Sequence, residues 1–125
     1  MYDSIIVGGG PAAVSAAINL KILGKNFLWL GSASSKKAAS AELVRNYPGL
    51  PDITGKQLVW TFENHVERLG IERTDALVTA VYDLDGRFAV AAGTETYECR
   101  TVILCTGVAA QKPIAGEEQF LGRGV

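Results

Sequence analysis

The segment best suited to bind a ligand is the glycine-rich run 8–13, Gly-Gly-Gly-Pro-Ala-Ala, which directly follows the apolar run 5–7. A buried strand that ends in a glycine turn and leads into a helix is typical of the phosphate-binding corner of dinucleotide folds. Gly8 permits the tight turn, and Gly10 lets the backbone approach a pyrophosphate without a Cβ in the way. Ala13 allows close helix–strand packing, and Pro11 suits the first helical turn. The free N–H groups and the dipole of that helix favour an anion, so the segment predicts a site for a nucleotide pyrophosphate.

The other reactive side chains form no recognisable catalytic or metal-binding set. Cys99 and Cys105 are not in a Cys-x-x-Cys motif, and in a regular strand their spacing would separate them by about 20 Å. We therefore expect two small buried side chains rather than a redox pair. His65 has no cluster of possible metal ligands beside it in the sequence and is expected to be a packed helix residue. Solvent-facing positions are expected for the carboxylates of Asp83, Asp85, Glu95 and Glu98.

A strand–helix–strand unit is expected to position the glycine-rich run. Residues 3–7 form the first strand, and apolar residues at three- and four-residue spacing, Ile22 among them, predict a helix over 11–23. Gly24 then ends that helix. The continuous apolar run 27–30 is typical of a parallel strand covered on both faces. This order is the βαβ unit that a dinucleotide fold requires.

A second helix is expected beyond a long irregular stretch, 31–53, of the kind that is usually functional or disordered. Thr54 begins this helix, because Gln57 stands three residues later and completes a capping box. Gly70 ends it, and its buried stripe is expected to be Leu58, Phe62, Val66 and Leu69.

Patterns of period two follow the second helix and predict strands. An antiparallel meander is expected over 76–84, 87–92 and 95–99, and a further buried strand over 101–105. The predicted fold is α/β and Rossmann-like, with flanking helices, a small antiparallel meander, and a parallel sheet of strands 3–7, 27–30 and 101–105. Residues 1–125 are expected to form one dinucleotide-binding domain.

Composition narrows the class of protein. Of 125 residues, 48% are hydrophobic and 20% charged, which is typical of a globular domain rather than a disordered chain. The net charge of −1 gives no electrostatic reason to expect nucleic acid or an anionic membrane as a partner. No apolar run approaches the ~20 residues of a membrane span, and the first residues lack the basic region of a signal peptide. We therefore expect a cytoplasmic protein.

Several motifs together resemble one family, the two-domain flavoprotein thioredoxin reductases. They occur in the order of the family and extend over the whole chain. They are DSIIVGGGPAA at 3–13, VRNYPG at 44–49, ITG at 53–55, TVILCTG at 101–107, AGE at 115–117 and GRGV at 122–125. The resemblance implies the FAD-binding half of such a reductase.

This resemblance implies a set of FAD contacts. The pyrophosphate would lie over Gly8, Gly10, Pro11 and Ala12, with Gly9 in the same turn. Gly31 and Ser32 would lie near the adenosine ribose and Val78 near the adenine. The ribityl chain and flavin ring would be approached by Lys37, Ala38 and Asn46, and the backbone of Cys105, Thr106 and Gly107 would pass close to the cofactor.

The chain departs from the family pattern at three places. Gly31 stands at the strand end where dinucleotide folds often place an acid for the ribose hydroxyls. The segment 35–37, Ser-Lys-Lys, replaces the Gly-Gly-Gln of the family. Its lysines either belong to a solvated loop, neutralise a flavin phosphate or dock an acidic electron donor. The last residues correspond to the hinge that leads into the NADPH-binding domain with its Cys-x-x-Cys, so that domain is expected to lie outside this sequence.

Three functional hypotheses therefore stand together. In the intact family, electrons pass from NADPH through the flavin to a protein disulfide, and this chain alone is not expected to catalyse that reaction. A second hypothesis is a non-catalytic nucleotide-binding module, or a fragment that needs a second chain. A third is an oxidoreductase with another electron donor, such as a ferredoxin. Because one face of the sheet is expected to be poorly covered, we also expect self-association.

Overall fold

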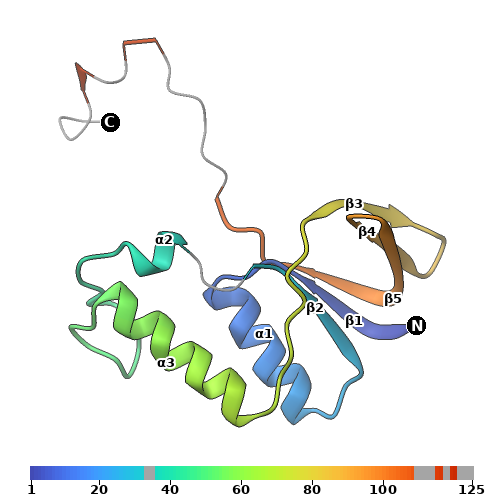
Figure 1. The fold of residues 1–125 in the computed structure, drawn as a ribbon, viewed down its shortest axis with the longest axis horizontal. Coiled ribbons are helices and arrows are strands. Elements are labelled where there is room, and N and C mark those ends of the chain that lie inside the picture. The colour runs from blue at the N-terminus through green and yellow to red at the C-terminus, as the bar shows by residue number, and fades with distance from the viewer. Residues whose placement is uncertain (33–35, 109–114, 117–118, 121–125) are drawn as a thin grey trace.

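The computed structural model describes residues 1–32, 36–108, 115–116 and 119–120, which form an α/β fold around one sheet of five strands (Figure 1). The spatial order of the strands is β2-β1-β5-β4-β3. The strands are β1 (Tyr2–Val7), β2 (Phe27–Leu30), β3 (Val78–Asp83), β4 (Phe88–Ala92) and β5 (Glu95–Leu104). The helices are α1 (Pro11–Ile22), α2 (Lys36–Ala39) and α3 (Gly55–Arg68). No helix in these described ranges is both long and apolar enough to cross a membrane.

The parallel part of the sheet is confirmed, with β1 between β2 and β5. Ile5 of β1 pairs in register with Leu28 of β2 and with Val102 of β5. The carboxyl ends of these three strands therefore meet at one edge of the sheet, which is the edge where ligands bind in open α/β folds.

The meander is joined to the parallel strands more closely than the sequence indicates. The two expected strands 95–99 and 101–105 are one continuous strand, β5, which pairs antiparallel with β4 and then parallel with β1. Cys99 is the crossover residue, because it is the register partner of both Phe88 and Tyr2. No turn-forming residue separates the two halves, so nothing interrupts the strand. The expected burial of 101–105 is wrong: Thr101 and Leu104 are exposed, Leu104 at 67%, and the other three residues are only half-buried.

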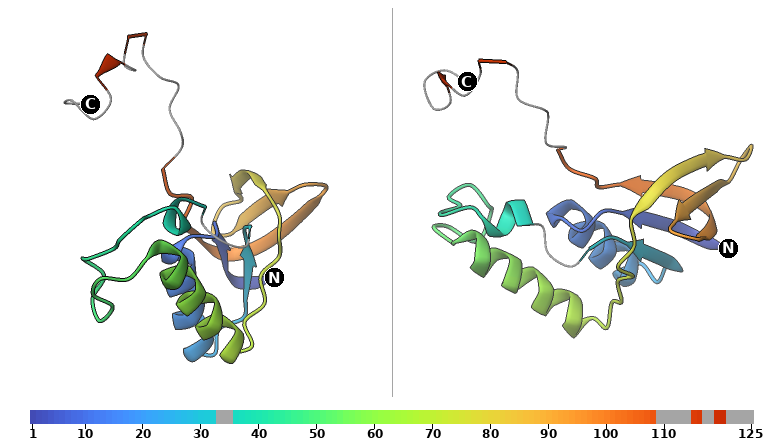
Figure 2. Two further views of the ribbon diagram at one scale, coloured as in Figure 1. Left: turned by 60° about the vertical axis from the view of Figure 1, so that its left-hand side comes forward. Right: turned by 45° about the horizontal axis from the view of Figure 1, so that its top comes forward.

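The two long helices pack on one face of the sheet. Figure 2 shows α1 and α3 side by side there, with the β3–β4 hairpin directed away from them. A core between helices and sheet includes Trp29, Val66 and Ile71, and a second core on the opposite face includes Leu30 and Val90. Helix α1 contributes its small buried residues, Ala13, Val14 and Ala17. Ile22, expected on the buried stripe, is 68% exposed, and the last turn of α1 packs against the core through Leu20 instead.

The expected irregular stretch contains two short ordered features. One is the single-turn helix α2, and the other is an antiparallel bridge between Val44 and Ile53. Beyond it, the capping box of α3 is confirmed. The Gln57 N–H donates to Thr54 Oγ1 at 3.3 Å, and the Thr54 N–H donates to Gln57 Oε1 at 3.1 Å.

Candidate functional site

The glycine turn after β1 is held between the ends of two neighbouring strands. The Gly8 N–H donates to the Leu30 carbonyl at 2.8 Å, and the Cys105 N–H donates to the Val7 carbonyl at 2.7 Å. Gly8 has a φ of +128°, and a Cβ there would lie 2.1 Å from the Cys105 carbonyl oxygen. No other residue fits without moving the chain just after β5, so the predicted tight turn at Gly8 is confirmed.

The ends of β1 and β2 approach each other through glycine as well. A Cβ on Gly9 would lie 2.1 Å from the Ser32 carbonyl oxygen, and one on Gly31 would lie 2.4 Å from the Gly8 carbonyl oxygen. The departure at Gly31 thus has a steric cause, because a side chain at this position would collide with the backbone of the turn. The sequence does not predict the close approach at Gly9, since three consecutive glycines do not indicate which one meets a neighbouring segment.

Helix α1 presents its amino end beside this turn. Gly10 is the N-cap, Pro11 occupies the first turn, and no side chain caps the helix or places an acidic group in its first turn. The Val14 N–H donates to the Gly10 carbonyl at 3.1 Å and begins the helical ladder. The preceding N–H groups and the helix dipole are therefore available to an anion.

A network of side chains that the sequence did not reveal contacts the glycine turn at the Gly8 carbonyl. The Trp29 Nε1–H donates to the Gly8 carbonyl at 2.7 Å. The Arg73 guanidinium lies 4.7 Å from the centre of the Trp29 ring and forms two hydrogen bonds to Glu63, at 3.0 and 3.1 Å. Trp29 is 1% exposed. These residues come from β2, α3 and the segment after α3, and no local motif links them.

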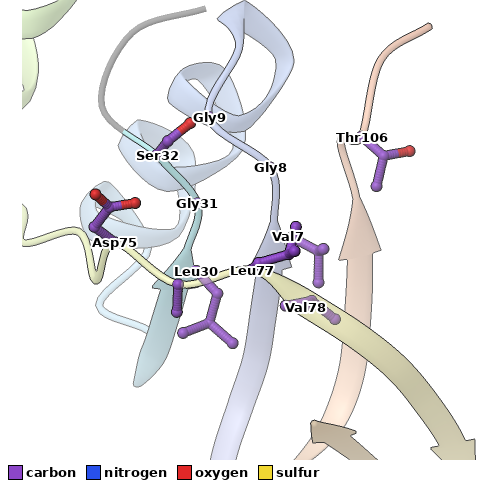
Figure 3. A pocket seen from close by; sticks show the side chains of 11 residues that line it. Val7, Gly8, Gly9, Leu30, Gly31, Ser32, Asp75, Leu77, Val78 and Thr106 are labelled. Atoms are coloured by element: carbon purple, nitrogen blue, oxygen red, sulfur yellow. The ribbon is translucent and has the colours of Figure 1, made fainter. Parts of the chain in front are cut away.

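A cavity of about 320 Å³ opens at the carboxyl edge of the sheet, beside the glycine turn (Figure 3). It brings together six of the predicted site residues: Gly8, Gly9, Gly31, Ser32, Val78 and Thr106. Sequence reasoning missed its other lining residues, which are Val7, Leu30, Asp75, Ala76 and Leu77. Glycines that bring the backbone to the rim, an apolar wall and an uncapped helix end fit the phosphate and adenosine parts of a dinucleotide.

The remaining predicted residues lie outside this cavity. Gly10 and Pro11 line a small hollow between α1 and α3, and Ala12 is exposed on the first turn of α1. Cys105 meets the turn through its backbone, and Gly107 is exposed with a φ of +68°.

The residues expected near the flavin ring are spread over the stretch that contains α2. Lys37 Nζ donates to the carbonyl of Val108, which ties α2 to the chain after β5. The carbonyl of Ala38 lies against Gly55, and Asn46 is exposed in the loop. Of the departing Ser-Lys-Lys segment, Ser35 and the Lys36 side chain lie outside the described residues, as do Glu117 and the run 122–125 of the family motifs.

Both cysteines are free thiols. Cys99 is fully buried, as expected, whereas Cys105 is only half-buried. Burial raises the pKa of each thiol above the usual value of 9.0; for Cys99, backbone hydrogen bonds at Ile5 and Thr101 partly oppose this rise. The thiolate, which is the nucleophilic form of cysteine, is therefore disfavoured at both positions.

Other candidate side chains form no centre within the described residues. No group of three His, Cys, Asp or Glu side chains there could hold a metal ion. The expectation that His65 packs against the fold is wrong, because it lies exposed on the outer side of α3. The solvent-facing positions expected for the four carboxylates of the hairpin region are confirmed: Asp83, Asp85, Glu95 and Glu98 are exposed.

Comparison with known proteins gives consistent matches along the whole chain. Residues 2–125 match the family described as Pyridine nucleotide-disulphide oxidoreductase. Thioredoxin reductase of Listeria monocytogenes is 34% identical over 128 residues, covering 100% of this chain and 40% of the relative. Thioredoxin reductase of Bacillus subtilis is 32% identical over 127 residues, with the same coverage.

Solved structures give the same picture. A Ferredoxin-Flavin Thioredoxin Reductase from Clostridium acetobutylicum is 38% identical, with a TM-score of 0.84 over 98% of this chain and 43% of that one. Thioredoxin reductase of Lactococcus lactis is 28% identical, with a TM-score of 0.83 over 99% of this chain and 42% of that one. This chain spans less than half the length of each of these relatives.

Proposed function

Because this chain belongs to the pyridine nucleotide-disulphide oxidoreductase family, we propose that it is the FAD-binding part of a thioredoxin-reductase-like flavoprotein. Membership of this family implies a flavin cofactor, and the proposal specifies FAD. The observation that carries it is the cavity at the carboxyl edge of the sheet, where Gly8, Gly9 and Gly31 keep three backbone segments in contact and leave room beside an uncapped helix end. A nucleotide diphosphate needs this combination of close backbone approach and free N–H groups.

Each part of FAD has residues of this chain to hold it. The turn 8–12 would bind the pyrophosphate through backbone N–H groups, and Ser32 and Val78 would adjoin the ribose and the adenine. Lys37, Ala38 and Asn46 would approach the ribityl chain and flavin ring, with the backbone of 105–107 on the other side. When bound, the flavin accepts and donates electrons, while the protein supplies position and electrostatics.

The reaction of the whole protein is proposed to be electron transfer through the flavin to a protein disulfide. The described residues contain two separate free thiols, so the disulfide and the site of electron entry would come from a part of the protein beyond this chain or from a second chain. Free thiols are also compatible with the reducing cytoplasm, which is the compartment we propose.

A ferredoxin is a second candidate for the electron donor, beside a nicotinamide nucleotide. The solved Ferredoxin-Flavin Thioredoxin Reductase is 38% identical to this chain, compared with 28% for the Lactococcus lactis reductase. Anaerobic mixing of the whole FAD-loaded protein, with the part that supplies electron entry present, with reduced ferredoxin or with NADPH separates the two donors. Bleaching of the flavin by only one of them identifies the donor of the whole protein.

The first experiment is an absorbance spectrum of the purified chain over roughly 300–550 nm, before and after FAD is added and unbound cofactor is removed. We expect retained flavin at near-unit stoichiometry. A folded, colourless protein that takes up neither FAD nor ADP would overturn the proposal and leave the glycine turn with a purely architectural role.

A further inference from the structure

At the end of β2, the structure has no room for the carboxylate that often binds the adenosine ribose in dinucleotide folds. Dinucleotide folds often place an acid at this strand end, and here the residue is Gly31. A Cβ on Gly31 would lie 2.4 Å from the Gly8 carbonyl oxygen and 2.9 Å from the Gly9 nitrogen. An acid at position 31 would therefore displace the turn that binds the pyrophosphate.

A second segment reaches the same edge of the sheet beside β2. Thr74 forms a parallel bridge with Leu30: the Thr74 N–H donates to the Trp29 carbonyl at 2.8 Å, and the Gly31 N–H donates to the Thr74 carbonyl at 3.0 Å. These two bonds fix the chain at Thr74 level with the end of β2. The next residue, Asp75, consequently stands at the carboxyl edge, where the ligand-binding loops of such sheets lie.

Asp75 lines the cavity together with Gly31 and Ser32, and it also borders a second hollow with Glu63 and Arg73. Figure 3 shows its carboxylate beside the chain at Gly31 and Ser32, at the same end of the sheet as the glycine turn. Within the described part of the chain, the Asp75 carboxylate has no ion-pair or hydrogen-bond partner. The adjacent cation, Arg73, is engaged by Glu63 and the Trp29 ring instead. The carboxylate of Asp75 is therefore free to accept hydrogen bonds from a ligand.

We propose that Asp75 replaces the acid that Gly31 excludes and accepts hydrogen bonds from the hydroxyl groups of the adenosine ribose. This inference rests on the proposed nucleotide site and assigns one of its contacts. Ribose hydroxyls are donors, and a carboxylate is an acceptor whose charge strengthens such bonds. The same charge disfavours a ribose that carries a 2′-phosphate, so the site would select nucleotides whose adenosine ribose has free hydroxyls.

The test compares ADP with 2′,3′-dideoxy-ADP by calorimetric titration of the wild-type chain and of Asp75→Ala. In the wild type, we expect ADP to bind at least about tenfold more tightly than the dideoxy compound, because a charge-assisted hydrogen bond is lost with the hydroxyls. In Asp75→Ala, the affinities for the two nucleotides should become nearly equal. Glu72→Ala is the matched control, since it removes one carboxylate from the same exposed segment but not from the cavity.

The outcomes separate this inference from the function on which it rests. If the wild type binds neither ADP nor FAD, the proposed function itself fails. If the wild type binds ADP and Asp75→Ala still prefers ADP to the dideoxy compound by the same factor, the role of Asp75 is wrong while the nucleotide site stands. A loss of preference in Glu72→Ala as well would also refute the assignment, because a general charge effect would explain both. Thermal unfolding of each variant checks that the fold is retained.

Discussion

Gly8 and Gly9 in the turn after β1 are required because the neighbouring backbone leaves no room for a Cβ atom. We predict that Gly9→Ala destabilises the protein by about 3 kcal/mol, since its Cβ would lie 2.1 Å from the Ser32 carbonyl oxygen and backbone must move. Gly24→Ala is the control, because its Cβ meets nothing within 4 Å and only the φ of +63° is strained, at about 1 kcal/mol. Urea unfolding measures both. Equal losses in the two variants would show that the contact at Gly9 is not tight.

Trp29 connects the core to the same turn through one hydrogen bond. In Trp29→Phe the ring is largely retained, but the Gly8 carbonyl loses its partner at 2.7 Å. We expect a loss of about 2 kcal/mol in the free energy of unfolding, together with weaker binding of FAD, because the orientation of the Gly8 peptide is no longer fixed. Trp60→Phe, at a side chain that is 69% exposed, should change neither quantity. An unchanged FAD affinity in Trp29→Phe would show that Trp29 does not position the turn for FAD binding.

The buried thiol of Cys99 gives the stability a dependence on alkaline pH. Its pKa is raised by burial above the usual 9.0, so above about pH 9 the folded state retains a proton that the unfolded state releases. The stabilising contribution is therefore complete below pH 9 and is lost as the pH rises through the folded pKa. We predict a steeper fall in unfolding free energy between about pH 8 and pH 11 for the wild type than for Cys99→Ala. Parallel slopes in urea unfolding would contradict this prediction.

At the scale of elements, the sequence predicted those structures that depend mainly on residues close together in the chain. The strand–turn–helix around Gly8, the start of α3 at Thr54 and the parallel pairing of β1 were all predicted from neighbouring residues. The pairing of the end of β2 with the segment that follows α3 was not. The bridge between Leu30 and Thr74 depends on where α3 delivers the chain, and Asp75 reaches the cavity only through that bridge. No pattern within residues 71–75 could have indicated it.

The continuity of β5 shows the same limit. A change of pairing partner at Cys99 is invisible in a sequence, because the backbone remains extended on both sides. The contacts of Trp29 with Gly8 and Arg73 likewise join three elements, and they follow from the packing of the core rather than from any spacing of residues. The glycine turn was thus predictable from its motif. The contacts of Trp29 and the continuous strand β5, which hold that turn in place, were not.

The capping box at the start of α3 is expected to contribute to the free energy of unfolding without affecting the cavity. Removal of the Thr54 hydroxyl in Thr54→Ala leaves the Gln57 N–H without its acceptor at 3.3 Å. We predict a loss of about 1 kcal/mol in unfolding free energy, without loss of FAD binding, because Thr54 does not line the cavity. Thr79→Ala is the control, since its exposed hydroxyl makes a single hydrogen bond of 3.4 Å to the Ala91 carbonyl. Equal stability of the Thr54→Ala protein and the wild type would show that the box contributes nothing.

At the scale of the whole molecule, large apolar side chains remain exposed at the carboxyl edge of the sheet. Leu104 is 67% exposed and is the register partner of Val7, which lines the cavity with Leu77, itself 80% exposed. Clustered apolar surface of this kind favours association. We therefore predict concentration-dependent self-association in sedimentation velocity, and we expect Leu104→Gln to weaken it by reducing the buried apolar area. Leu23→Gln, 66% exposed at the far end of α1, is the control. A wild type that sediments as a single monomer at all concentrations, or an equal effect of the two variants, would show that this edge is not the contact between copies.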